Sequence, residues 1–150
     1  MAGSSIYLRG HIIFSTKNRE PYISSEIGHR LVKYTGGIIR ENKGKLLEAN
    51  ALPDHVHLYV SLRSEPSIAA LLRLIKTNSS KWIKQAYPSM SYFEWQKGYG
   101  FFSVSPSQDK ATIRYINRQE DHHRKRSFKE EFLNFLKKHD IEYDERYIWD

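Results

Sequence analysis

The block Asp54-His55-Val56-His57-Leu58 carries the sharpest candidate chemistry in this chain of 150 residues. In a β-strand alternate side chains share a face, so His55 and His57 are expected to point the same way. Two imidazoles placed two residues apart on an open sheet face can bind one divalent cation. A chance pair is the alternative, because the chain contains seven histidines. The spacing alone leaves both interpretations open.

A second candidate is Tyr115, with Gln119 one helical turn further along the chain. Side chains four residues apart lie on the same side of a helix, and Gln108, Thr112 and His122 extend this polar side. The opposite side has only a thin apolar stripe, made of Ala111, Ile113 and Ile116. Such a helix is expected to dock loosely and to present its polar side to a partner. The alternative is an ordinary solvated helix with an exposed tyrosine.

Basic residues surround these candidates, and the net charge of +7 with a pI of about 9.5 favours a polyanionic partner. Aromatic residues make up 13% of the chain, and rings beside cations are what single-stranded bases stack on. Composition alone does not decide the matter, because many basic proteins bind no nucleic acid. The candidate phosphate-binding side chains are Lys17, Arg19, Arg73, Lys76, Arg114 and Arg118.

Hydrophobic periodicity predicts four strands, at residues 6–15, 45–51, 55–62 and 92–104, the last interrupted at 97–100. It predicts helices at residues 25–42, 66–86, 106–122 and from 127 onwards, with capping boxes that begin at Ser105 and Ser127. The order of the elements predicts a single α+β domain over residues 1–150, a ferredoxin-like sandwich whose antiparallel sheet has helices on one face. The expected core is residues 6–104, followed by the tyrosine helix (106–122) and a C-terminal helix and tail (127–150).

Several protein classes are disfavoured by the composition. The chain has no cysteine, so a metal must be bound by histidine, carboxylate or amide groups. No apolar run approaches the roughly 18 residues that a membrane span needs, and the N-terminus lacks the pattern of a signal peptide. We therefore expect a cytoplasmic protein with no membrane partner.

Four segments together resemble the single-tyrosine HUH transposases of bacterial insertion sequences, to which the REP-associated tyrosine transposases are closely related. The segments are His11-Ile12-Ile13-Phe14-Ser15-Thr16-Lys17-Asn18-Arg19, Pro53-Asp54-His55-Val56-His57-Leu58, Gly98-Tyr99-Gly100-Phe101-Phe102-Ser103-Val104-Ser105 and Tyr115-Ile116-Asn117-Arg118-Gln119-Glu120-Asp121-His122-His123. They occur in the expected order, and the resemblance extends from about Tyr7 to Trp149.

The resemblance implies a ferredoxin-like fold and a divalent metal, Mg²⁺ or Mn²⁺. His55 and His57 match the paired histidines of the motif, Tyr115 matches the nucleophile, and Gln119 matches the position that completes the metal site. Such enzymes cleave and rejoin hairpin-bearing single-stranded DNA through a 5′-phosphotyrosine link. They often act as homodimers in which the tyrosine helix of one subunit completes the site of the other.

The residues offer no obvious dedicated general base beside Tyr115. His122 lies further along the same polar side of the helix, and His11 is interpreted as structural or DNA-contacting. Three alternatives stay open: an inactive or domesticated relative that binds single-stranded nucleic acid, an RNA-binding ferredoxin-like module, and a metal hydrolase in which water is the nucleophile.

Overall fold

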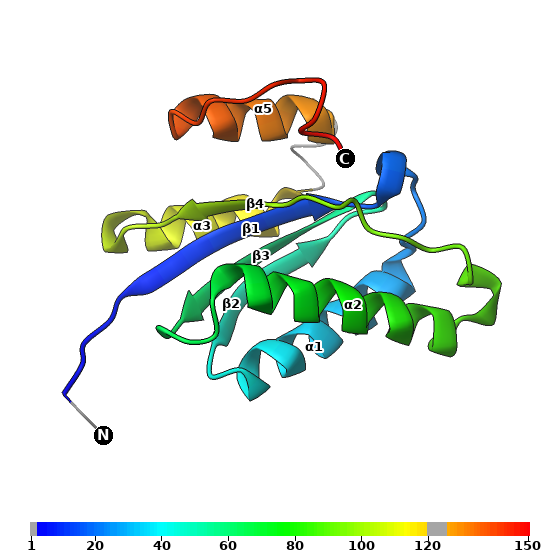
Figure 1. The fold of residues 1–150 in the computed structure, drawn as a ribbon, viewed down its shortest axis with the longest axis horizontal. Coiled ribbons are helices and arrows are strands. Elements are labelled where there is room, and N and C mark those ends of the chain that lie inside the picture. Colours follow the sequence, from blue (N-terminus) through cyan, green and yellow to red (C-terminus); the bar gives the residue numbers. More distant parts are fainter. Residues whose placement is uncertain (1–2, 120–125) are drawn as a thin grey trace.

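A four-stranded antiparallel sheet forms the centre of the molecule (Figure 1). The computed structural model describes residues 3–119 and 126–150. The strand order is β2-β3-β1-β4, which is the ferredoxin-like arrangement predicted from the sequence. The strands are β1 (Leu8–Ser15), β2 (Lys45–Ala51), β3 (His55–Leu62) and β4 (Gly100–Ser103).

Two long helices, α1 (Ser25–Glu41) and α2 (Ile68–Ala86), cover one face of the sheet (Figure 1). Each begins at a serine whose hydroxyl accepts a hydrogen bond from a backbone N–H, Ser24 from Ile27 and Ser67 from Ala70. The main hydrophobic core lies between these helices and the sheet. It is filled by the side chains on one face of β1 and β3 and by the apolar stripes of the two helices.

The other face of the sheet carries α3 (Asp109–Asn117) and α5 (Phe128–Lys138) (Figure 1). The hydroxyl of Ser127 accepts a hydrogen bond from the Glu130 N–H, as the predicted capping box requires. A second apolar cluster joins α5 to the sheet through Ile13, Phe102, Phe128, Phe132 and Leu136. The C-terminal helix is therefore a layer of the fold and covers the face that was expected to be open.

Two local predictions were wrong. Of the strand predicted at residues 92–104, only Gly100–Ser103 pairs as a strand, with an isolated bridge between Thr16 and Trp95. The ammonium group of Lys76 donates hydrogen bonds to the carbonyls of Gln96, Lys97 and Gly98, and these carbonyls are then not available for a strand ladder.

The tyrosine helix also begins later than predicted. Pro106–Gln108 forms a 3₁₀ turn, and the Ser105 side chain makes no capping hydrogen bond but contacts the Ser107 hydroxyl at 2.9 Å. Further 3₁₀ turns lie at Lys17–Arg19 and Pro88–Met90.

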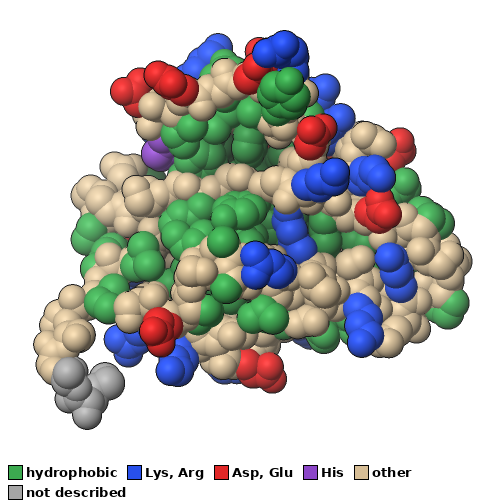
Figure 2. All heavy atoms as spheres, in the orientation of Figure 1, with side chains coloured by type: hydrophobic (Ala, Val, Ile, Leu, Met, Phe, Trp, Pro, Cys, Tyr) green, Lys and Arg blue, Asp and Glu red, His purple; other side chains and the backbone are tan. Residues whose placement is uncertain are grey.

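Within the described residues, no helix is long and apolar enough to cross a membrane. On the face shown in Figure 2, Lys and Arg side chains are spread over the C-terminal layer and over the rest of the molecule, with acidic side chains among them. The positive charge is therefore not gathered into one patch on this face.

Candidate metal and nucleophile site

The two histidines of β3 lie on the sheet face that α3 and α5 cover. The alternation predicted for this strand is confirmed, because Val56 and Leu58 belong to the main core on the other face. His55 and His57 are both 0% exposed, so the expectation of an open histidine face was wrong. The face is closed because α5 packs its aromatic side chains over it; the ring of Phe128 lies 5.0 Å from that of His55.

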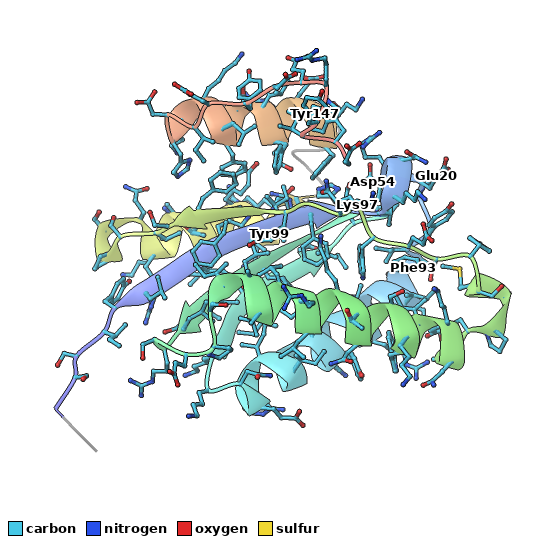
Figure 3. All side chains as sticks on the ribbon, viewed as in Figure 1. Glu20, Asp54, Phe93, Lys97, Tyr99 and Tyr147 are labelled. Atoms are coloured by element: carbon cyan, nitrogen blue, oxygen red, sulfur yellow. The ribbon has the colours of Figure 1, made fainter. Side chains whose placement is uncertain are left out.

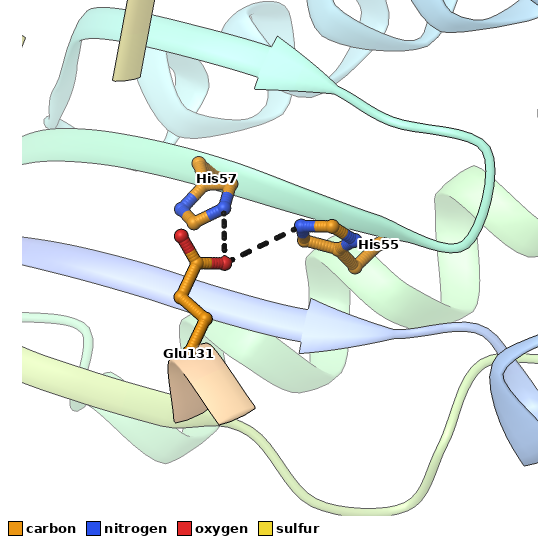
Figure 4. A group of neighbouring side chains, drawn as sticks. All are labelled: His55, His57 and Glu131. Atoms are coloured by element: carbon orange, nitrogen blue, oxygen red, sulfur yellow. Dashed lines mark ion pairs between the residues drawn. The ribbon is translucent and has the colours of Figure 1, made fainter. Parts of the chain in front are cut away.

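Glu131 of α5 points at both imidazoles (Figure 4). Its Oε1 lies 3.2 Å from Nε2 of His57 and 3.6 Å from Nε2 of His55, and the side chain is almost fully buried. The three possible ligand atoms all lie within 4.8 Å of one another. Sequence analysis missed Glu131. The available signal was that it is the one acidic residue on a helix face otherwise formed by Phe128, Phe132 and Phe135.

Hydrogen bonds to the far nitrogens orient the two rings. Nδ1 of His55 lies 2.6 Å from the Asp54 carboxylate, and Nδ1 of His57 lies 2.7 Å from Nε2 of His11. With both Nδ1 atoms protonated and donating, each Nε2 keeps its lone pair on the Glu131 side. His11 is thus a positioning residue for His57. Figure 3 shows Asp54 at the end of the sheet, below the C-terminal layer.

The surroundings shift the pKa values of His55 and His11 in opposite directions. Burial lowers the pKa of His55, but the hydrogen bonds and negative charges of Asp54 and Glu131 outweigh burial and raise it overall. Burial holds the pKa of His11 well below its usual range, and the neighbouring His57 adds to this effect. His11 is therefore neutral and able to accept the hydrogen bond from His57.

This donor set suits a divalent cation. Two imidazole nitrogens and a carboxylate oxygen converge on one point, and these are ligand types that first-row divalent metals accept. Three electron-rich atoms so close together repel one another unless a proton or a cation lies between them. The cluster of His55, His57 and Glu131 could therefore bind a metal.

Tyr115 meets the same carboxylate. Its hydroxyl donates a hydrogen bond to Oε2 of Glu131, and its ring centroid lies 6.1 Å from that of His57 in the same chain. Burial, followed by the charge of Glu131 and its hydrogen bond, raises the pKa of the phenol above its usual value of 10.0. The resemblance implied a tyrosine helix acting in trans; in this single chain the helix lies beside the histidines of its own chain.

Gln119 is fully buried, and its Nε2 lies 3.2 Å from the backbone carbonyl of Tyr115. The carboxylate that approaches the histidines belongs to Glu131, and a metal-binding role for Gln119 stays a prediction. His122, the other residue considered beside the tyrosine, lies outside the described residues.

Polar contacts, which sequence analysis also missed, hold α3 on the sheet. The carboxylate of Asp109 accepts hydrogen bonds from Arg9 and Tyr59, each at 2.6 Å. At the other end of the helix, Nδ2 of Asn50 donates to the Ile116 carbonyl at 3.0 Å. These contacts compensate for the thin apolar stripe and fix the position of Tyr115.

The predicted phosphate-binding residues lie on several surfaces. Lys17 pairs with Glu94 at 2.9 Å, Arg19 donates to the Trp149 carbonyl at 3.3 Å, and the Lys76 ammonium binds three carbonyls. Arg73, Arg114 and Arg118 are exposed. Lys17, Arg73 and Lys76 line one groove, and Arg114 and Arg118 lie apart from it on the tyrosine helix and its end. The contact of the six residues with nucleic acid remains a prediction.

Comparison with known proteins agrees with the fold and with the sequence motifs. A model of the family described as IS200-like transposases matches residues 4–119, most of the chain, and the protein belongs to this family. The resemblance to insertion-sequence transposases is thereby confirmed. Membership of this family supports, in general terms, the role of a DNA-cleaving enzyme.

The ISDra2 transposase TnpA of Deinococcus radiodurans is 25% identical over 119 residues, which cover 76% of this chain and 85% of that protein. A crystal structure of a Deinococcus radiodurans R1 protein assigned as a transposase aligns with a TM-score of 0.66 and 23% identity, over 79% of this chain and 95% of that one. A REP-associated tyrosine transposase bound to a REP hairpin aligns with a TM-score of 0.58 and 16% identity, over 82% and 74%. The two structures support the fold.

Proposed function

We propose that this protein is a metal-dependent transposase that cleaves and rejoins hairpin-bearing single-stranded DNA, with Tyr115 as the nucleophile. The observation that carries the proposal is the position of Glu131. One of its carboxylate oxygens accepts the Tyr115 hydroxyl proton in a hydrogen bond, and the other faces His55 and His57. A candidate nucleophile and a candidate metal site thus share one carboxylate.

Cleavage is a phosphoryl transfer to the phenol. The Tyr115 oxygen forms a bond to phosphorus, the bond from phosphorus to the 3′ oxygen breaks, and that oxygen takes up a proton to become a 3′-hydroxyl. The tyrosine proton passes to its hydrogen-bond acceptor, Glu131. The 5′-phosphotyrosine ester conserves the energy of the phosphodiester bond that was broken. Attack of a 3′-hydroxyl on this ester therefore reseals the strand without another energy source.

His55, His57 and Glu131 are the residues that would hold the metal, and Gln119 is a further proposed ligand. The cation would supply Lewis-acid stabilisation of the charge that develops on the phosphate. Imidazole ligands favour Mn²⁺ over Mg²⁺, which prefers oxygen ligands and retains much of its water. Asp54 and His11 would fix the two imidazoles in the orientation that a ligand needs.

DNA is the proposed partner, by analogy with the REP-associated relative that was solved with a hairpin. Lys17, Arg19, Arg73, Lys76, Arg114 and Arg118 are the proposed phosphate contacts outside the site. A homodimer remains part of the proposal, with each tyrosine serving its own chain.

The experiment uses a labelled pool of DNA hairpins with single-stranded flanks, incubated with Mn²⁺ or Mg²⁺ and run on a denaturing protein gel. We expect a metal-dependent covalent band for the wild type and none for Tyr115→Phe, which lacks only the nucleophilic oxygen. Free cleaved ends without any covalent band would instead support water as the nucleophile. DNA binding without cleavage would support an inactive, binding-only protein.

A further inference from the structure

A cleft of about 290 Å³ lies between α3 and α5 and reaches Tyr115. The helix α3 and the turn before it contribute Gln108, Thr112 and Tyr115, and α5 contributes Glu131, Asn134 and Lys138. On each helix these residues recur every three or four positions and so form one face. The polar faces of α3 and α5 thus lie on opposite sides of the cleft.

The hydrogen bond between Tyr115 and Glu131 fixes one point of the cleft. Lys138 is seven residues beyond Glu131, which places it about 10 Å further along the helix axis at a rise of about 1.5 Å per residue. A volume of about 290 Å³ is just below the range of ligand pockets, roughly 300–1,000 Å³. The cleft therefore suits a small unpaired group and is too small for a duplex.

Three of the polar side chains that line the cleft are available to a ligand. Gln108, Asn134 and Lys138 are exposed, and among the described residues their side chains make no hydrogen bond or ion pair. Lys17, Arg19 and Lys76 differ, since each is already engaged within the protein. The rings of His11 and Phe135, 5.0 Å apart, also line the cleft. A cation, two amides and aromatic rings are the groups that bind a phosphate and a base.

We propose that the α3–α5 cleft binds one unpaired nucleotide next to the phosphate that Tyr115 attacks. Lys138 contacts the phosphate on the far side of this nucleotide, and Gln108 and Asn134 face its base. The proposal rests on the proposed function and adds a substrate subsite to it. Because α5 lies beyond the residues that match the family model, this subsite depends on a part of the chain that the family match does not include.

The absence of cysteine makes a direct footprint possible. Asn134→Cys places a thiol in the cleft, and Lys137→Cys places one on an exposed position of the same helix that does not line the cleft. Both variants are alkylated with N-ethylmaleimide in EDTA, with and without a pool of DNA hairpins that carry randomised single-stranded flanks. We expect the flanked hairpins to slow alkylation of the thiol at position 134 several-fold and to leave that at position 137 unchanged. Hairpins without flanks should protect neither.

A second measurement compares Lys138→Ala with Lys137→Ala in binding to the flanked hairpins at several salt concentrations. Loss of one phosphate contact to a single strand should lower the slope of log affinity against log salt by about 0.7 for Lys138→Ala alone. Equal protection at positions 134 and 137, or equal slopes, would overturn the proposed subsite. EDTA prevents metal-dependent cleavage, so these results are separate from the covalent band. Protection without a band would contradict the proposed function, and a band without protection would contradict only the subsite.

Discussion

Glu131 connects the two halves of the candidate site through its two carboxylate oxygens. One oxygen lies 3.2 Å from His57, and the other accepts the Tyr115 hydroxyl. A carboxylate in this position can hold the Tyr115 phenol at a fixed position relative to a bound metal. In the proposed mechanism Glu131 is also the proton acceptor, a role for which the sequence offered no obvious candidate.

At the residue scale, Glu131→Gln tests the ligand assignment. The amide keeps the size of the side chain but removes its negative charge, so Mn²⁺ affinity should fall by more than about tenfold. Loss of even an outer partner of a metal ligand typically weakens binding by about 10- to 100-fold. Isothermal titration calorimetry with Mn²⁺ measures the change. Glu130→Gln, one position earlier and exposed, is the control and should bind as the wild type does. Equal affinity of both variants would exclude Glu131 as a ligand.

Individual site residues were predictable to different degrees. His55 and His57 could be placed on one face from the two-residue period of a strand, and Tyr115 from the resemblance. Glu131 could not, because its contact with His57 spans 74 positions and depends on where α5 docks. Burial of the histidines was missed for the same reason. Local patterns in a sequence show which side of α5 is apolar but not which surface that side covers.

At the element scale, α3 is held by polar contacts at its two ends and by the fully buried side chain of Ile116. Asp109 at its start accepts hydrogen bonds from Arg9 and Tyr59. The hydrogen bond from Tyr59, with that from Arg9, lowers the pKa of the Asp109 carboxyl below its usual value of 3.8. Burial and the hydrogen bond to Asp109 raise the pKa of Tyr59 to about 12. Tyr59 therefore stays a donor throughout the neutral range.

Asp109→Asn should lower the stability of the protein, because it removes the charge that receives these two hydrogen bonds. A carboxyl with a depressed pKa stabilises the fold fully above its unfolded pKa and loses this contribution as the pH falls through the folded value. The difference in Tm between wild type and Asp109→Asn should therefore be present at pH 7 and shrink below about pH 4. Thermal unfolding followed by circular dichroism measures it. Glu142→Gln, an exposed control, should show no difference. A pH-independent difference would show that the charge of Asp109 is not what stabilises α3.

Most element positions followed from the sequence. β2, β3 and the start of α1 lie where periodicity predicted them, and α2 begins within two residues of its predicted start. The structure of the segment before β4 did not follow from the sequence. Its apolar residues suggested a strand, but the Lys76 ammonium binds its carbonyls. A tertiary contact of this kind overrides a local preference for strand.

At the scale of the whole molecule, contacts of Trp149 and Asp150 hold the C-terminal layer in place over the site. The Gly98 N–H donates to the Asp150 carbonyl at 2.9 Å, and Arg19 donates to that of Trp149 at 3.3 Å. The Trp149 ring packs on Phe128 and Phe132 at the start of α5. One chain thus brings the sheet, the tyrosine helix and the covering helix together at the candidate site.

A site within one chain predicts the result of a mixing experiment. Tyr115→Phe and His57→Gln chains, each inactive alone, should remain inactive when mixed, because neither contains a complete set of residues. Glutamine is chosen because His57 is fully buried and needs a side chain of similar size. Circular dichroism would establish that both variants are folded. Restored covalent band formation in the mixture would mean that the tyrosine acts in trans.

If Tyr115 is the nucleophile, it becomes covalently joined to DNA, and tandem mass spectrometry can locate that link. Wild-type protein would be incubated with Mn²⁺ and the hairpin pool, treated with nuclease and digested with trypsin. Cleavage after Arg114 and Arg118 releases the short peptide Tyr115-Ile116-Asn117-Arg118. We expect a nucleotide on the tyrosine of this peptide, and only when metal is present. A nucleotide on any other peptide would contradict this expectation.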